Sequence, residues 1–211
     1  AITSGNDAVV ALAERIAGSE EAFVKRMNAR GKDLGIKNTN FVNATGLTAD
    51  NHYSSSYDMS LIAKELVKHE KILEFTGTYE DYLRKDTKSP FWLVNTNRLV
   101  RFKEGVDGLK TGFTNEAGYC LTATMKKDGM RLITVVMKEE TANKRSADTT
   151  KIMSVEASDE SEDYRIKQAI IKNSNDVIIH DCTTNGKLDS VTLVKNTSEN
   201  KSAKLYAALY N

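Results

Sequence analysis

The chain has 211 residues, and its 30 basic and 29 acidic side chains nearly cancel to a net charge of +1. A chain of this length can bury one sizeable core and a small second domain. No basic stripe is interleaved with aromatic residues, so a nucleic-acid partner is not expected. Hydrophobic residues make up 40% of the chain, and no apolar run approaches the roughly 18 residues of a membrane span.

Two helices are predicted near the amino terminus, and both are expected to face the core. Apolar residues recur at helical spacing in residues 9–16 and again in residues 23–34, after Gly18-Ser19. These apolar residues are Val9, Leu12, Ala13 and Ile16, followed by Phe23, Met27 and Leu34. Residues 38–57 are rich in Asn, Thr, Ser and Gly and favour a long surface connection. A capping pattern at residues 55–58 then predicts a helix over residues 56–68.

The next predicted unit is an antiparallel hairpin. Residues 118–126 alternate along the chain, residues 130–137 form a second strand-like run, and Asp128-Gly129 favours a two-residue turn between them. A helix over residues 141–153 is expected to cover the resulting sheet. Residues 110–112 come just before the hairpin, so we expect them at an exposed sheet edge.

A separate unit is predicted for the last part of the chain, from residue 154 onward. Five acidic side chains lie within residues 156–163 without an intervening base, a pattern typical of a solvated linker. Strand-like runs at residues 177–179 and 191–194 flank Asn185-Gly186, a hairpin-like pattern too short to be stable alone. We therefore expect one domain over residues 1–153, an acidic linker at 154–168 and a partial β-rich domain at 169–211.

The two cysteines, Cys120 and Cys182, are too few for a disulfide framework. Neither has metal-ligand spacing with a histidine, so neither a metal site nor a cofactor is expected. Cys120 lies in an alternating run, where a small buried hydrophobe is the simplest explanation.

The most informative chemical signal is Lys110-Thr111-Gly112, which is followed by Phe113. Lysine supplies a charge and up to three donors, threonine supplies a directional hydroxyl, and glycine lets a ligand approach the main chain closely. This combination favours a receptor for a carboxylate. The alternative explanation is a lysine beside an ordinary turn glycine.

A second signal is Ser4-Gly5-Asn6, immediately before the first predicted helix. Ser-x-Asn is a common pattern in a chain rich in serine and asparagine, and Ser198-Glu199-Asn200 repeats it. Taken alone, Ser4 is best explained as a helix cap.

Together, in this order, the two motifs resemble those of the serine D-alanyl-D-alanine carboxypeptidases, the low-molecular-mass penicillin-binding proteins. That family carries Ser-x-x-Lys, Ser-x-Asn and Lys-Thr-Gly, and this chain matches the second and third. Further similar stretches are residues 18–24, 43–47 and 52–59. The resemblance covers about residues 1–153 and implies an α+β fold, a β-lactamase/transpeptidase-like domain with helices on an antiparallel sheet.

The first family motif is missing. In the family, Ser-x-x-Lys lies several dozen residues before Ser-x-Asn, whereas this chain begins three residues before Ser4. Ser198-Glu199-Asn200-Lys201 matches by letters, but it follows both other motifs, so we interpret it as a chance match. The chain is therefore expected to be an N-terminally truncated fragment, inactive by itself, whose nucleophilic serine and lysine base lie upstream.

The resemblance implies catalytic roles for Ser4, Asn6 and Lys110. Ser4 would relay a proton between the upstream lysine and the departing D-alanine nitrogen, and Asn6 would hold the acyl side of the peptide. Lys110 would bind the terminal carboxylate of the substrate.

The resemblance also implies substrate-binding roles for Thr111, Gly112 and Phe113. Thr111 would share the carboxylate with the lysine, and Gly112 would permit close approach. The backbone N–H of Phe113 would supply half of an oxyanion hole.

The implied substrate is a peptidoglycan stem peptide ending in D-Ala-D-Ala, which is cleaved through an acyl-enzyme, and β-lactams are the implied inhibitors. This substrate implies an extracytoplasmic protein, secreted or attached to the outer face of the bacterial cytoplasmic membrane. A signal segment and a C-terminal membrane anchor are expected outside this chain.

Two alternatives stay open. A noncatalytic peptidoglycan-binding pseudoenzyme would keep the carboxylate receptor, and the residues upstream would decide between it and an enzyme. A serine β-lactamase-like hydrolase is disfavoured, because Ser4-Gly5-Asn6 is not Ser-Asp-Asn and no deacylating glutamate motif is evident.

Overall fold

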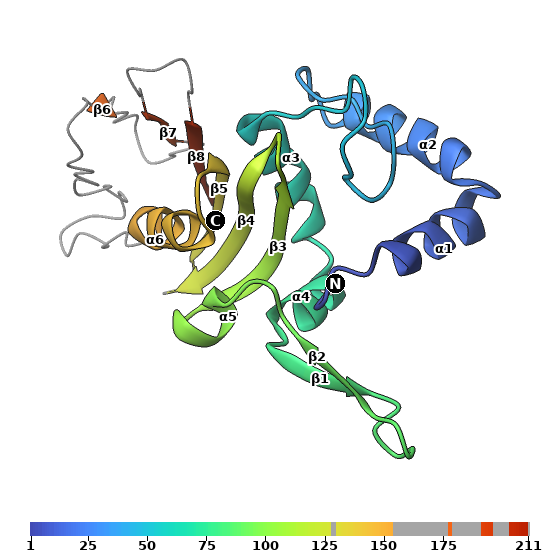
Figure 1. The fold of residues 1–211 in the computed structure, drawn as a ribbon. Coiled ribbons are helices and arrows are strands. Elements are labelled where there is room, and N and C mark those ends of the chain that lie inside the picture. The colour runs from blue at the N-terminus through green and yellow to red at the C-terminus, as the bar shows by residue number, and fades with distance from the viewer. Residues whose placement is uncertain (128–129, 154–176, 179–190, 196–202, 211) are drawn as a thin grey trace.

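The computed structural model describes residues 1–127, 130–153, 177–178, 191–195 and 203–210 (Figure 1). Its centre is an antiparallel sheet with the strand order β3-β4-β5-β8-β7-β6. The strands are β3 (Val106–Thr114), β4 (Gly118–Lys127), β5 (Met130–Glu139), β6 (Val177–Ile178), β7 (Val191–Lys195) and β8 (Ala203–Tyr210). The predicted hairpin is confirmed as β4 and β5, whose ends pair at Lys127 and Met130.

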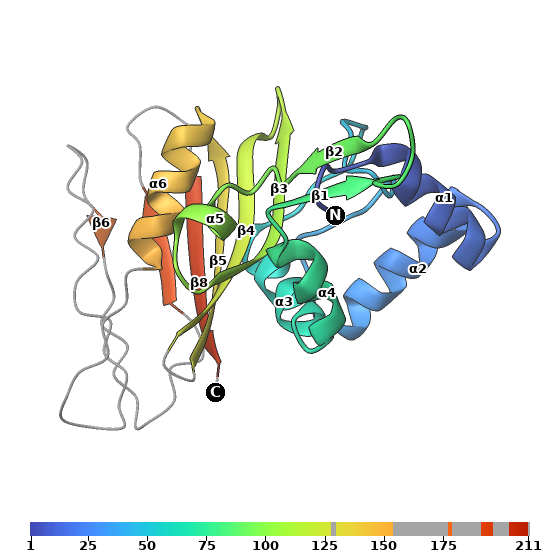
Figure 2. The same ribbon diagram turned by 90° about the horizontal axis from the view of Figure 1, so that it is seen from below.

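Helices cover both faces of the sheet (Figure 2). α5 (Leu99–Phe102) and α6 (Ala142–Ile152) lie on one face, whereas α3 (Ser56–Leu66) and α4 (Glu70–Gly77) lie on the other. The helices predicted over residues 56–68 and 141–153 are thus confirmed as α3 and α6. So is the expected α+β architecture, with helices packed on an antiparallel sheet.

Each face of the sheet has its own core, because successive side chains of a strand point to opposite faces. The core under α5 and α6 contains Leu99, Val106, Leu121, Ala123, Met125, Leu132, Val136, Ile152 and Met153. The core under α3 and α4 contains Ala63, Leu109 and Ile133, with Val67 and Leu73 packed against it. Both cores together hold β3, β4 and β5 in one register.

A two-stranded ribbon projects from the main body between α4 and α5 (Figure 1). It consists of β1 (Glu80–Leu83) and β2 (Phe91–Val94), which pair in antiparallel register with Tyr82 opposite Trp92. Both of these rings are about half exposed. The sequence did not predict this ribbon, α4 or α5.

The strands near the carboxyl terminus join the main sheet. β8 pairs with β5 from Arg131↔Tyr210 to Val136↔Leu205, and β7 pairs with β8. Strands were predicted at the positions of β6 and β7, but in a separate unit. The edge of β5 offers unpaired backbone groups, which a further strand satisfies. The linker expected at residues 154–168 lies outside the described residues, so the domain boundary there stays a prediction.

α1 (Asn6–Ala17) and α2 (Glu20–Asp33) form a helical hairpin that stands away from the sheet (Figures 1 and 2). Both helices were predicted, but the expectation that the apolar residues of α1 face the core is only partly right. Ala13 is fully buried, whereas Leu12 and Ile16 are 60% and 52% exposed. The reason is that α1 packs on α2 instead of on the sheet.

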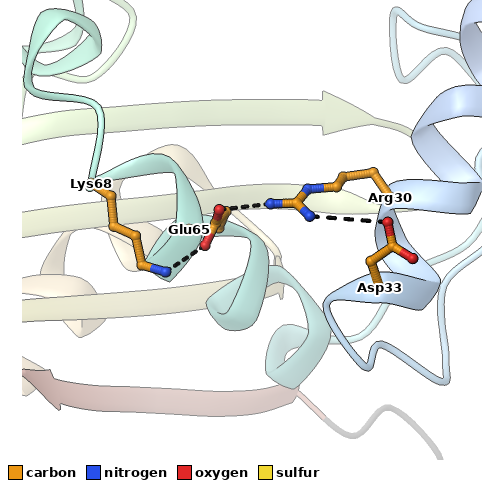
Figure 3. A network of polar contacts seen from close by, with 4 residues as sticks. All are labelled: Arg30, Asp33, Glu65 and Lys68. Carbon is orange, nitrogen blue, oxygen red and sulfur yellow. Dashed lines mark hydrogen bonds and ion pairs between the residues drawn. The ribbon is translucent and has the colours of Figure 1, made fainter.

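An ion-pair network connects α2 to the end of α3 (Figure 3). One Glu65 oxygen accepts from Arg30 Nη2 at 2.7 Å, and the other accepts from Lys68 Nζ at 2.7 Å. Asp33 Oδ2 lies 4.0 Å from Arg30 Nη1. The hydrogen bond from Lys68 and the charge of Arg30 lower the pKa of Glu65. The Arg30, Asp33 and Lys68 side chains are largely exposed, so the network connects the helices without contributing much to stability.

Asp58 anchors the long connection between α2 and α3. Ser55 caps α3 as predicted, because its side chain accepts a hydrogen bond from the Asp58 N–H at 3.1 Å. The Asp58 carboxylate turns back to the connection and accepts from Asn38 N at 2.6 Å, Thr39 Oγ1 at 2.8 Å and Lys37 N at 3.4 Å. Asp58 is only 1% exposed. A buried charge with three donors therefore fixes a segment that has little regular structure of its own.

No helix among the described residues is both long enough and apolar enough to cross a bilayer.

Replacing Asp58 with alanine should lower the free energy of unfolding by about 2–3 kcal/mol, because buried donors lose a charged acceptor. Urea unfolding followed by circular dichroism measures this change. Asp33→Ala is the matched control, since it removes an exposed carboxylate, and it should leave the unfolding midpoint unchanged. An unchanged midpoint for Asp58→Ala would show that this carboxylate does not hold the connection.

Candidate functional site

β3 is an edge strand, and it carries four of the six predicted site residues, 110–113. β4 pairs with one side of β3, placing Lys110 opposite Thr122 and Gly112 opposite Cys120. The backbone groups on the other side of an edge strand have no strand partner. Leu109 is buried, whereas Lys110 and Gly112 are exposed. The expectation that residues 110–112 lie at an exposed sheet edge is confirmed.

The ammonium group of Lys110 lies along this edge. Its Nζ donates a hydrogen bond to the Thr111 carbonyl oxygen at 2.6 Å. Partial desolvation lowers the pKa of Lys110 from the ordinary value of 10.5, and the nearby Arg145 guanidinium lowers it further. Arg145 comes from α6 and is 7% exposed. Two neighbouring cations favour an anion at this edge.

Gly112 leaves the same edge open. A Cβ at this position would meet only the Cβ of Cys120, at 3.9 Å, which is an ordinary contact. No packing contact within the described residues therefore requires glycine here. The next residue, Phe113, is 54% exposed, and its ring centroid lies 4.3 Å from that of Tyr119.

Thr111 is joined to a residue that the sequence did not single out. Its Oγ1 donates a hydrogen bond to Thr96 Oγ1 at 2.7 Å. Thr96 follows β2, and its backbone N–H donates to the Ile2 carbonyl oxygen at 3.2 Å. Thr96 thus connects β3 to the segment that carries Ser4.

Ser4 and Asn6 lie where this segment enters α1. The explanation of Ser4 as a helix cap is wrong, because Gly5 occupies the N-cap position and no side chain caps the helix. Ser4 has a φ of 59°, a left-handed conformation that costs a residue with a side chain about 1–2 kcal/mol. Ser4 and Asn6 are both exposed. Among the described residues, no hydrogen bond runs from either side chain to β3, and the connection passes through Ile2 and Thr96.

Cys120 faces Gly112 across the β3–β4 pair, but it does not have the properties of a nucleophile. It is a free, half-buried thiol, and burial raises its pKa. A raised pKa disfavours the reactive thiolate. The position of Cys120 is therefore consistent with the packing role expected from the sequence.

Residues 1–142 match the model of the D-alanyl-D-alanine carboxypeptidase family, Peptidase S11. The chain belongs to this family. It is 62% identical over 153 residues to the D-alanyl-D-alanine carboxypeptidase DacF of Bacillus subtilis strain 168, covering 72% of this chain and 39% of that protein. It is 41% identical over 154 residues to DacA of Escherichia coli K12, covering 72% and 37%. The chain thus spans about two fifths of the length of these relatives.

Solved structures share the fold. Penicillin-binding protein D2 from Listeria monocytogenes, in its cefotaxime-bound form, matches with a TM-score of 0.65 and 39% identity, covering 72% of this chain and 61% of that chain. The Streptomyces K15 DD-transpeptidase matches with a TM-score of 0.67 and 29% identity, covering 72% and 62%. The described residues therefore have the fold of penicillin-recognising proteins, as the sequence implied.

Lys110 should titrate below 10.5 in the free chain, because partial desolvation and the charge of Arg145 both disfavour its ammonium form. Heteronuclear NMR of the lysine side chain measures this pKa. Arg145→Met removes the neighbouring charge and should move the pKa of Lys110 back toward 10.5, whereas Arg145→Lys keeps the charge and should move it less. A Lys110 that titrates at 10.5 or above in the parent chain would contradict the described electrostatics.

Proposed function

We propose that residues 1–153 are part of a serine D-Ala-D-Ala carboxypeptidase domain, which removes the terminal D-alanine of peptidoglycan stem peptides through an acyl-enzyme. Family membership and 62% identity to a D-alanyl-D-alanine carboxypeptidase support this proposal. The observation that carries it is the free edge of β3, where a cation, a hydroxyl and an uncrowded glycine lie in three consecutive residues. The substrate implies an extracytoplasmic setting.

In this proposal, the β3 edge binds the terminal carboxylate of the peptide. Lys110 now donates to a carbonyl oxygen of its own strand, and it would exchange this neutral acceptor for the carboxylate in a stronger, charge-assisted bond. Thr111 would donate a second bond, and Gly112 would let the peptide backbone lie close to β3. A main-chain carboxylate is free only at a chain end, so a receptor for this group favours exopeptidase chemistry.

The proposed roles of Ser4 and Asn6 concern the other side of the peptide. Ser4 would relay a proton to the departing nitrogen, and Asn6 would hold the acyl part. Two observations support this: the side chain of Ser4 is not used as a cap, and its backbone is strained, as is common at functional sites. Phe113 would contribute its backbone N–H to the oxyanion hole, where one donor is worth about 3 kcal/mol.

The acylated serine is not assigned to any described residue. A serine hydroxyl needs a base within hydrogen-bond reach. Within the 211 residues, Ser-x-x-Lys occurs only at residues 198–201, after both other motifs and outside the described residues. We assign substrate binding and proton relay to this chain, with the nucleophile on a Ser-x-x-Lys segment upstream of Ser4. β-Lactams, which carry a carboxylate beside a reactive amide, would bind at the same edge.

The chain should bind N-acetyl-D-Ala-D-Ala about tenfold more tightly than the C-terminal amide of this peptide, because only the acid can use Lys110. NMR titration measures both dissociation constants. Lys110→Met should abolish the preference for the acid. Lys126→Met, which removes an exposed lysine farther along β4, is the matched control and should retain the preference. Equal affinity of the parent for acid and amide would contradict the proposal.

The affinity for the acid should also depend on pH in a defined direction. Lys110 binds the carboxylate as an ammonium, so affinity should fall as the pH rises through its pKa, which lies below 10.5 in the free chain. The affinity for the amide should stay constant over the same range. Titrations at several alkaline pH values measure this difference.

A fluorescent penicillin should not label the 211-residue chain covalently, whereas a longer chain with Ser-x-x-Lys upstream of Ser4 should be labelled at that serine. Gel fluorescence and mass spectrometry locate the label. Labelling of Ser4 or Ser198 in the shorter chain would contradict the assignment of roles. A longer chain that binds the peptide but is never labelled would favour the pseudoenzyme.

A further inference from the structure

We infer, on the basis of the proposed function, that Thr96 is a positioning residue for the substrate carboxylate. When a carboxylate is bound, the Thr96 hydroxyl donates to that of Thr111, so that the single Thr111 hydrogen points to the ligand.

Thr96 lies in the segment of residues 95–97, and Asn95 fixes the beginning of this segment. This residue is 5% exposed, and its Nδ2 donates to the carbonyl oxygens of Thr76 at 2.9 Å and Thr78 at 2.8 Å. Its Oδ1 accepts from the backbone N–H of Asn97 at 2.8 Å. Asn95 thereby ties the segment to the end of α4.

Asn97 fixes the end of the same segment. It is 1% exposed, and its Nδ2 donates to the Gly108 carbonyl oxygen in β3 at 3.1 Å, while its Oδ1 accepts from Leu99 N at 3.2 Å. Gly108 lies two residues before Lys110, so this bond connects the segment directly to the strand of the receptor. Hydrogen bonds from buried polar side chains to the backbone make a segment rigid.

Thr96 lies between these two buried asparagines but is itself exposed. Its Oγ1 accepts a hydrogen bond from Thr111 Oγ1 at 2.7 Å, and its backbone N–H donates to the Ile2 carbonyl oxygen at 3.2 Å. Threonine is branched at Cβ, which restricts its χ1 angle and limits the positions of its hydroxyl. The asparagine bonds and this restriction hold the Thr96 hydroxyl in place before a ligand arrives.

The donor count sets the direction of the hydrogen bond. A threonine hydroxyl has one hydrogen and two acceptor sites, and an ionised carboxylate only accepts. When Thr111 donates to a carboxylate, it has no hydrogen left for Thr96. In the free chain Thr111 is the donor in the 2.7 Å contact. With a carboxylate bound, the contact persists only if its direction reverses, with Thr96 as donor and Thr111 as acceptor, an arrangement that also polarises the Thr111 hydroxyl.

The test compares Thr96→Val, which keeps the branched shape without a donor, with Thr96→Ser, which keeps the hydroxyl. NMR titration should show that Thr96→Val weakens binding of N-acetyl-D-Ala-D-Ala by about five- to tenfold, and that Thr96→Ser stays within about twofold of the parent. Binding of the C-terminal amide should change little in either variant. Thr87→Val, at an exposed threonine in the ribbon turn, is the matched control and should bind like the parent.

Equal affinity of Thr96→Val and the parent for the acid would overturn the inference, and so would a Thr96→Ser variant as weak as Thr96→Val. If valine disturbs the fold, as judged by the amide spectrum, Thr96→Ala provides the same loss of donor. A parent chain with no preference for the acid would instead contradict the proposed function, and the role of Thr96 would fall with it. The parent titration therefore separates the two failures.

Discussion

The antiparallel pairing of β3 with β4 is the interaction on which the candidate site depends. It places Lys110 opposite Thr122, and Leu109 opposite Ala123 in the neighbouring pair. Successive side chains of a strand point to opposite faces, so a slip by one residue would move Leu109 out of the core. Leu109 is 4% exposed and packs with Ala63 and Ile133, which fixes the register. The geometry of the exposed β3 edge therefore depends on the packing of the neighbouring residue, Leu109.

Polar contacts hold the segment that follows β2 against this strand pair. Asn95 and Asn97 attach the segment after β2 to α4 and β3 through bonds to main-chain carbonyl oxygens. Thr96, between them, connects Thr111 with Ile2 and so brings the start of the chain to the strand. The two motifs, which are 106 residues apart in the sequence, are thereby linked through Ile2 and Thr96, which belong to neither motif. Rigid surroundings of this kind reduce the entropy lost when a ligand binds.

Much of this arrangement could be predicted from the sequence where the signal is local. A capping pattern and apolar periodicity predicted α3, and alternation predicted the β4–β5 hairpin. The position of residues 110–112 just before that hairpin predicted an exposed sheet edge. The contact between Thr96 and Thr111 joins residues that are 15 apart, and no periodic pattern marks it. The exposure of Leu12 depends on which surface α1 packs against, which periodicity does not specify. The pairing of β8 with β5 is a long-range contact that periodicity does not specify either. The helices α4 and α5 and the strands β1 and β2 are too short to show a recognisable periodic pattern.

The central claim is that the free edge of β3 receives a peptide carboxylate. A crystal structure of the chain with N-acetyl-D-Ala-D-Ala tests this claim most directly. It should show the carboxylate within hydrogen-bond distance of Thr111 Oγ1, with Lys110 Nζ moved from the Thr111 carbonyl oxygen to the ligand and the Thr96–Thr111 contact retained. A peptide bound away from β3, or bound there with its carboxylate turned away from Lys110 and Thr111, would contradict the account.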